Sequence, residues 1–393
     1  MEGREACLRL LKSLVQESSA DQTEALLLTE DSSLTRFAQS SIHQHVAEKN
    51  GTLILRVVLG KRIAVVTTNI LSLSSAKASL ERAISLAKVQ RPNEAFISLP
   101  EPSSIPSIVT FSGNISRLTP AKKAKKIKEL LGLLKGEGFH ASGAFSNGEV
   151  ELAVVNSLGV EAYQEYSDLF FHLIAENGSG SGYASFVTRD PDELDIHSLA
   201  REAIHKASKG KPISVDPGKY EVILEPYAVS EFLSFLGYLS FNALAIQEER
   251  SFFCNQFGKK LVGETVTIYD DGLDPHGLQV PFDFEGLPKQ RVIFFEKGIA
   301  KEVTYDSFTA GREGKISTGH GLIAPNTAGP IPINLCPLSA QGGSIATGRR
   351  TWSFRLWVAH LASLITLLRP CDLPPTGLPD STAPSPGAGR RPG

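Results

Sequence analysis

The stretch Pro226-Tyr-Ala-Val-Ser-Glu-Phe-Leu-Ser-Phe-Leu-Gly-Tyr-Leu-Ser-Phe-Asn-Ala-Leu-Ala-Ile-Gln-Glu-Glu-Arg250 decides how the second half of this chain is interpreted. Its apolar residues recur at helical spacing on more than one face, which predicts a long helix over residues 226–250. Such a helix must be buried, either in its own core or against another subunit. We expect its own core to cover it. The stretch contains no histidine, and none occurs between residues 206 and 275.

The region before this helix predicts an α+β fold of two domains, with antiparallel sheets and packed helices. The predicted strands and helices do not alternate regularly along the chain, which argues against a doubly wound parallel sheet. The first domain combines predicted helices and strands, with a hairpin at Leu59-Gly60: helices at 4–18 and 72–88, and strands at 24–29, 33–47, 52–59 and 61–68.

A Pro- and Ser-rich stretch at residues 100–107 reads as a linker. The predicted domains are therefore 1–105, an α+β domain, and 119–335, with 106–118 as the linker between them. The second domain begins with a predicted helix at 120–134, whose basic run we expect to form a solvated face: Lys122, Lys123, Lys125, Lys126 and Lys128. Strands at 138–145, 149–156 and 160–175 follow.

The composition changes after about residue 335. From Pro337 to Gly393 there are 8 Pro and 6 Arg but neither Lys nor Glu. We interpret residues 336–393 as a divergent Pro/Arg-rich tail with the composition of disorder. One hypothesis is that this tail is a coding frame read out of register, which would make the chain a truncated or frameshifted, non-functional protein. A genuine extension is the alternative.

Charge and cysteine content restrict the classes of partner. A formal net charge of −2 offers no field for binding nucleic acid or an anionic membrane. The longest apolar stretch, 352–368, is shorter than the roughly 20 residues that a spanning helix needs. The four cysteines form no Cys-x-x-Cys pair, which predicts reduced thiols in a cytoplasmic protein: Cys7, Cys254, Cys336 and Cys371.

Several runs, in the same order over residues 1–335, together resemble the TldD/PmbA peptidase family. They include Thr35-Arg-Phe-Ala-Gln-Ser-Ser-Ile-His-Gln-His45, Asn156-Ser-Leu-Gly-Val160, Pro217-Gly-Lys-Tyr-Glu-Val-Ile-Leu-Glu-Pro-Tyr-Ala-Val229 and Phe284-Glu-Gly-Leu-Pro-Lys-Gln-Arg291. The resemblance implies a peptidase complex in which a metal-bearing subunit and a metal-free subunit pair and cut peptides or unfolded segments. It also implies that peptide adds to a sheet edge as an extra strand.

In the metal-bearing branch of that family, the helix equivalent to 226–250 carries a His-Glu-x-x-x-His zinc motif, which this chain lacks. The resemblance therefore implies the metal-free branch. We expect no cofactor in this chain, zinc in a TldD-like partner subunit, a peptide substrate and a dimer. Catalytic zinc needs about three protein ligands and a nearby carboxylate base.

The candidate catalytic residues are Glu231, on the predicted helix, and His320, in the Gly-rich run Thr318-Gly-His-Gly321. A solvated helical glutamate is the competing interpretation of Glu231. A second hypothesis is an autonomous metallopeptidase with an unrecognised site around Glu231, His276 and His320. Whether the chain is itself an enzyme stays open between these hypotheses.

Overall fold

The computed structural model describes residues 2–178, 180–209, 213–219, 224–275 and 277–339. They belong to the first of two compact units, residues 1–355; the second unit, 356–393, lies outside the described residues. The predicted tail is thus outside them from residue 340 onward, as is part of the Pro217–Val229 run, residues 220–223.

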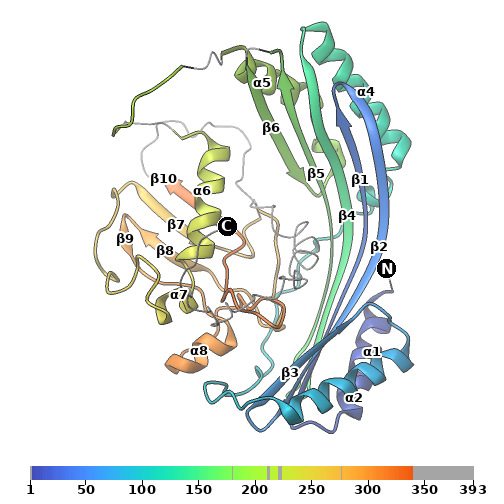
Figure 1. Ribbon diagram of the computed structural model, residues 1–393, viewed down its shortest axis with the longest axis vertical. Coiled ribbons are helices and arrows are strands. Elements are labelled where there is room, and N and C mark those ends of the chain that lie inside the picture. The colour runs from blue at the N-terminus through green and yellow to red at the C-terminus, as the bar shows by residue number, and fades with distance from the viewer. Residues whose placement is uncertain (1, 179, 210–212, 220–223, 276, 340–393) are drawn as a thin grey trace, which may run out of the picture. The chain divides into compact units, whose positions relative to one another are not determined.

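A six-stranded antiparallel sheet with the order β3-β2-β1-β4-β5-β6 dominates the first part of this unit (Figure 1). Its strands are β1 (Gln22–Ala38), β2 (Ser41–Leu59), β3 (Arg62–Thr68), β4 (His140–Asn156), β5 (Glu161–Glu176) and β6 (Ser181–Thr188). Antiparallel strands with helices against one face confirm the predicted α+β class. The predicted hairpin forms between β2 and β3, with its turn at Gly60 and Lys61, one residue later than expected.

The strands predicted at 24–29 and 33–47 are wrong in extent. β1 is continuous to Ala38, and the chain turns at Gln39 and Ser40, both with positive φ. Such turns favour Gly, Asn or Asp, so the sequence carries no turn signal here. A hydrogen bond to the neighbouring strand β4 stabilises the turn instead: the amide of Ser40 donates to the carbonyl of Ala141 at 2.9 Å. The strands predicted at 138–145 and 149–156 are likewise one strand, β4.

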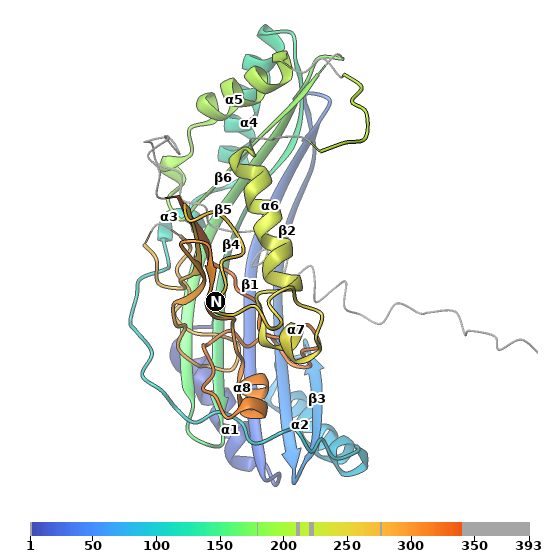
Figure 2. The ribbon, with the colours of Figure 1, turned by 90° about the vertical axis from the view of Figure 1, so that its left-hand side faces the viewer.

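The sheet also crosses the predicted linker. β1 pairs with β4 without interruption from Glu24–Asn156 to Phe37–Gly143, so strands from both sides of residues 106–118 share one ladder. The linker therefore does not separate two sheets. Its first part, residues 106–112, belongs to an extended connection between α2 (Leu73–Val89) and α3 (Gly113–Ser116), which Figure 2 shows without helix or strand, and residues 113–116 form α3 itself.

Helices cover one face of the six-stranded sheet at both of its ends (Figure 1). At one end, α1 (Arg4–Glu17) and α2 pack on the alternate residues Ala25 and Leu27 of β1. At the other end, α3, α4 (Pro120–Gly136) and α5 (Ile196–Lys209) pack on β4 and β5 around Phe145 and Phe171. A one-turn 3₁₀ helix, η1 (Pro191–Glu193), precedes α5.

The predicted solvated face of α4 is wrong at Lys123. Its side chain is fully buried, and its Nζ donates to the carbonyl oxygen of Ser33 at 3.0 Å and to the Ser33 hydroxyl at 2.6 Å. Burial lowers the Lys123 pKa from 10.5 to about 8. A helical lysine can extend along an apolar surface to a polar group beyond it, and the sequence does not reveal that group.

The chain after α5 covers part of the opposite face of the sheet. Leu26, Ile54 and Val154, which alternate with the helix-facing residues, pack with Phe282. This second part contains α6 (Pro226–Leu239), α7 (Ala243–Gln247), α8 (Ser307–Glu313) and a four-stranded sheet of order β10-β7-β8-β9. Its strands are β7 (Val266–Asp270), β8 (Val292–Glu296), β9 (Ile299–Ala300) and β10 (Leu335–Ser339).

Candidate functional site

The helix expected over residues 226–250 is interrupted, and Asn242 is the reason. Its Nδ2 donates to the carbonyl of Tyr238 at 2.8 Å, at the end of α6. Its Oδ1 accepts from the amide of Ala245 at 2.9 Å and so caps the start of α7. One amide side chain thus satisfies backbone groups on both sides of the break.

Most of α6 is not buried. Leu233 and Gly237 are its buried residues, and Gly237 approaches Pro332 and Leu335 so closely that a Cβ would lie 3.0 Å from the proline ring. Four large side chains are largely exposed: Phe232 by 56%, Phe235 by 57%, Tyr238 by 43% and Leu239 by 49%. The expectation that the chain's own core covers residues 226–250 is confirmed at Leu233 and Phe241, which lie in a hydrophobic core, and is wrong at these four side chains. We call these four residues the α6 apolar face.

The side chains of α6 that could act as metal ligands are too few for a zinc ion. Between Pro226 and Leu239, Glu231 is the only residue with a carboxylate, imidazole or thiol, and it is exposed to solvent. Nowhere among the described residues do three or more His, Cys, Asp or Glu side chains gather as metal ligands. Because a catalytic zinc needs about three protein ligands, no step through a metal is assigned to α6.

His320 lies in a buried polar cluster instead of a cavity. Its Nε2 is 2.9 Å from Oδ2 of Asp270, and its Nδ1 is 2.9 Å from the hydroxyl of Thr318. Burial and the positive charge of Lys289 lower the His320 pKa, which favours the neutral ring. No described contact joins His320 to Glu231, so the structure does not bring the two candidate catalytic residues together.

The Cys336 thiol is held in its protonated form. Burial and the nearby Asp274 carboxylate raise the pKa of Cys336 to about 12, so the thiol stays protonated. His276 and Cys371 lie outside the described residues.

A buried charge cluster that the sequence did not indicate connects the two parts of the described unit. Arg56 of β2 contacts Glu24 of β1 at 2.6 Å and Glu285 at 3.3 Å. The Glu285 carboxylate also accepts hydrogen bonds from the amide and hydroxyl of Ser307 at 2.8 and 2.6 Å. In the sequence, Arg56 has the position of an exposed polar residue in an alternating strand. Its burial cannot be predicted locally, because Glu285, which covers it, is more than 200 residues away in sequence.

Side chains close the outer edge of β6. The hydroxyl of Tyr227, in the first turn of α6, accepts from the amide of Ser185 and donates to the carbonyl of the same residue, both at 3.1 Å. Lys206 of α5 donates to the carbonyl of Tyr183 at 3.1 Å and lies 4.4 Å from the centre of the Tyr227 ring. An incoming strand would need these same backbone groups.

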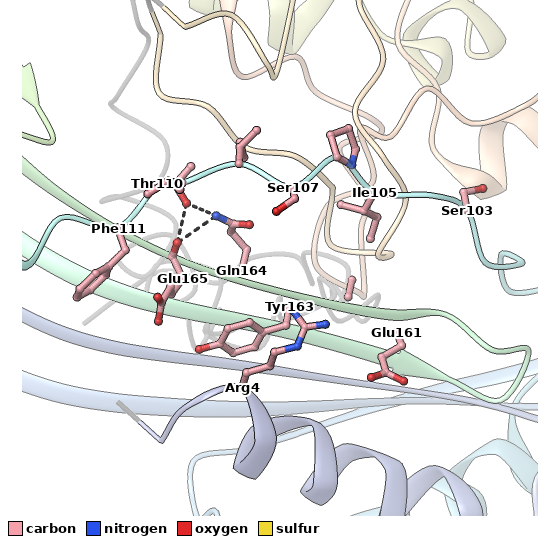
Figure 3. Close-up of a pocket in the computed structure, with 14 residues that line it drawn as sticks. Arg4, Ser103, Ile105, Ser107, Thr110, Phe111, Glu161, Tyr163, Gln164 and Glu165 are labelled. Atoms are coloured by element: carbon pink, nitrogen blue, oxygen red, sulfur yellow. Dashed lines mark hydrogen bonds between the residues drawn. The ribbon is translucent and has the colours of Figure 1, made fainter.

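A cavity of about 490 Å³ lies beside the first half of β5 (Figure 3). One wall is β5 from Glu161 to Glu165, and the other is the extended connection over residues 103–111. Figure 3 shows Arg4 of α1 against the Tyr163 ring, whose centre is 5.7 Å from the guanidinium carbon. The size falls within the range of roughly 300–1,000 Å³ typical of ligand pockets.

No helix among the described residues is both long and apolar enough to cross a lipid bilayer.

Two sequence profiles of one family match consecutive parts of the chain. The profile described as "PmbA/TldA metallopeptidase central domain" matches residues 113–210, and the one described as "PmbA/TldA metallopeptidase C-terminal domain" matches residues 217–340. These are 98 and 124 residues, which is more than half of the 393-residue chain.

Individual proteins are similar over shorter stretches. An uncharacterized protein of Methanocaldococcus jannaschii is 33% identical over 172 residues, which are 42% of this chain and 40% of that protein. A metalloprotease TldD homolog of Buchnera aphidicola is 37% identical over 83 residues, 21% of this chain and 17% of that protein. The matched segments therefore span less than half of either relative.

Similarity in fold extends further than similarity in sequence. The crystal structure of TldE from Thermococcus kodakarensis superposes with a TM-score of 0.72 at 22% identity, covering 84% of this chain and 75% of that one. At this identity the likeness concerns the fold alone.

Proposed function

The chain belongs to the PmbA/TldD metallopeptidase family, and we propose that it is the metal-free subunit of a two-chain peptidase. The partner is a metal-bearing TldD-like homologue, and the substrate is a peptide or an unfolded segment. In this proposal zinc lies in the partner, and the complex is a cytoplasmic dimer.

The α6 apolar face is the observation that carries the proposal. An apolar surface of several large side chains is a typical protein–protein contact, and aromatic residues contribute most of the binding energy in such contacts. Three of its four residues, Phe232, Phe235 and Leu239, follow the i, i+3, i+7 spacing of one helix face. A partner that covers this face would remove the exposed side chains from water.

The lack of metal-ligating side chains on α6 supports the proposal that zinc lies in the partner subunit. A helix with one exposed carboxylate and no imidazole does not meet the needs of catalytic zinc, whereas a His-Glu-x-x-x-His helix in the partner would. The contribution of this chain would then be binding and orientation of the partner and the peptide.

The test is co-expression with a family member from the same organism that carries the His-Glu-x-x-x-His motif. We expect a stable 1:1 complex by size-exclusion chromatography with light scattering, and cleavage of an unfolded peptide by that complex. A Phe232→Ser/Phe235→Ser variant should weaken the complex by at least about tenfold. Val89→Ser, which changes an exposed residue at the end of α2, is the matched control and should leave the complex intact.

A monomer under these conditions, or equal assembly of both variants, would refute the proposal. Metal analysis of the isolated chain separates it from the autonomous metallopeptidase hypothesis. Stoichiometric zinc that supports peptide cleavage and is lost with Glu231→Gln would favour that alternative.

A further inference from the structure

Lys123 of α4 is an enclosed cation without a carboxylate partner among the described residues. Two other enclosed cations, Arg56 and Lys289, lie beside acidic side chains. Burial alone shifts the Lys123 pKa, and in the described part of the chain its Nζ bonds only to Ser33, at the carbonyl oxygen and the hydroxyl. A buried ammonium without a counter-ion costs free energy that an apolar side chain of similar length would not. Such a lysine, with a pKa of about 8, is a candidate for a functional role.

The Ser33 hydroxyl lies between Lys123 and Asn147. Its Oγ is 2.6 Å from Nζ of Lys123 and donates to Oδ1 of Asn147 at 3.1 Å. Ser33 is directly opposite Ala47 of β2 and Asn147 of β4, so these side chains share one face of the sheet. Three elements, β1, β4 and α4, thus place a hydroxyl within proton-transfer distance of a lysine nitrogen and beside a carboxamide.

The serine oxygen, and not the lysine nitrogen, is accessible to a small molecule. Ser33 is half-buried and its neighbour Ala47 is small and exposed, whereas the Lys123 side chain is fully buried. Among the described residues, Nδ2 of Asn147 makes no hydrogen bond, so a donor is available beside the same oxygen.

Other charged side chains on this face of the sheet have partners of their own. His45 of β2 lies 2.8 Å from the hydroxyl of Thr35, and burial and the charge of Lys123 lower the His45 pKa. His45 therefore loses its proton at a lower pH than Lys123 does. The remaining charged groups nearby are held in an ion pair or by the Ser116 hydroxyl: Asp31 with Lys49, and Glu149.

We propose that Ser33 is a nucleophile, with Lys123 as its general base, in a metal-independent site that hydrolyses small acyl esters. Ser33 Oγ bonds to the ester carbonyl carbon while its proton passes to the neutral Nζ of Lys123. The bond from that carbon to the leaving oxygen then breaks, and the Lys123 ammonium gives the proton to the departing alcohol. Nδ2 of Asn147 donates to the carbonyl oxygen as negative charge develops on it.

Water completes the reaction on the acyl-serine. Lys123 takes a proton from the water as its oxygen bonds to the acyl carbon, and returns it to Ser33 Oγ as the carboxylic acid leaves. Esters are the class of substrate because an alcohol departs more readily than an amine from a site with one side-chain donor for the oxyanion. The small Ala47 beside the hydroxyl favours a small acyl group.

The test uses the full chain without any partner, in the presence of EDTA, with 4-nitrophenyl acetate as the ester. We expect saturable release of 4-nitrophenolate and an acetyl group on Ser33, located by peptide mapping. Hydroxylamine should remove this group, because it cleaves an ester but not an acetylated lysine. The rate of acetylation should rise with pH around a midpoint of about 8, where Lys123 becomes neutral.

Variants assign the roles. Ser33→Ala should abolish the acetylation, Lys123→Met should slow it by at least about hundredfold and remove the pH midpoint, and Asn147→Ala should slow it by at least about tenfold. The matched controls are Ser32→Ala, on the opposite face of β1, and Lys122→Met, an exposed neighbour on α4. Both should react at the rate of the unmodified chain.

A second variant keeps the proposal testable if Lys123→Met does not fold. Ser33→Cys places a thiol beside the Lys123 ammonium, which should lower the thiol pKa below the ordinary value of about 8.5. The pH dependence of alkylation by iodoacetamide measures this pKa. A thiol with the ordinary value would contradict the proposed pair.

Acetylation of Ser33 at an equal rate in a folded Lys123→Met variant, acetylation confined to lysines, or a rate without a midpoint near pH 8 would each overturn the proposal. The complex with the metal-bearing homologue is proposed to form through the α6 apolar face, which contributes no residue to this site. Failure here is therefore distinguishable from failure of the proposed function.

Discussion

The imidazole Nε2 of His320 lies 2.9 Å from Oδ2 of Asp270, and neither side chain is accessible to solvent. The amide of Asn334, directly before β10, donates to the other oxygen of Asp270 at 2.6 Å. Burial by itself would raise the Asp270 pKa, but the hydrogen bonds from His320 and Asn334 and the charge of Lys289 lower it. The aspartate is therefore ionised and depends on its donors.

His320→Ala should destabilise the fold by about 3 kcal/mol, because it leaves a buried carboxylate without one of its donors. Urea unfolding at pH 7 measures the change. His197→Ala is the matched control, since His197 contacts Glu129 at 2.8 Å on the exposed surface and should cost less than about 1 kcal/mol. Equal decreases in the free energy of unfolding for the two variants would show that the buried His320–Asp270 pair contributes no more to stability than an exposed pair.

Arg56→Met should destabilise the protein by about 3–5 kcal/mol, because it leaves two buried carboxylates facing each other. Burial already raises the Glu24 pKa, and Arg56 opposes that rise. Denaturant unfolding compares this variant with Lys12→Met, which removes an exposed ion pair with Glu161 and should cost less than about 1 kcal/mol. A small effect of Arg56→Met would mean that water reaches the cluster.

Burial of the Lys123 ammonium group should make the free energy of unfolding increase as the pH rises above 8. Its pKa is about 8 in the fold, against an ordinary lysine value of 10.5 in the unfolded chain. Between these values the unfolded chain binds more protons, so raising the pH favours the folded state. Urea unfolding at pH 8 and pH 10 measures the effect. Between these two pH values the free energy of unfolding should increase by about 2 kcal/mol less for Lys123→Met than for the unmodified chain.

The matched control for this titration is Lys122→Met, which changes an exposed neighbour on the same helix. It should follow the pH profile of the unmodified chain. An identical profile for Lys123→Met would contradict the burial of the ammonium group against Ser33.

Tyr227→Phe should open the edge of β6, since the hydroxyl alone satisfies both outward backbone groups of Ser185. We expect faster hydrogen exchange at the Ser185 amide and a stability loss of about 1 kcal/mol. Tyr238→Phe, on the exposed side of the same helix, should change neither quantity. An unaltered exchange rate at Ser185 in the Tyr227 variant would argue against edge protection.

Local signals of the sequence located many elements correctly. The alternation before Gly60 and after Lys61 predicted the β2–β3 hairpin, and the helix predicted from Pro120 is α4, whose start the structure shows capped by the Thr119 hydroxyl. The family resemblance is confirmed by two profile matches. The roles of Glu231 and His320 remain predictions, although their surroundings are now defined.

Other predictions failed because the deciding contact lies far away in sequence. The Gln39-Ser40 turn is fixed by Ala141, and Lys123 is buried by reaching Ser33. The predicted linker could not reveal that β1 and β4 share one ladder, because strand pairing is set by tertiary register and not by the composition between the strands.

By itself, the sequence indicated the family through its resemblance to TldD/PmbA proteins, and its residue types and short-range periodicity determined the antiparallel α+β character and a helix from Pro226 without imidazoles. Only the tertiary structure decided that His320 is enclosed with Asp270, that the α6 apolar face stays exposed and that a cavity adjoins the first half of β5. Burial and strand pairing depend on which distant segments meet, and a local pattern does not contain that information.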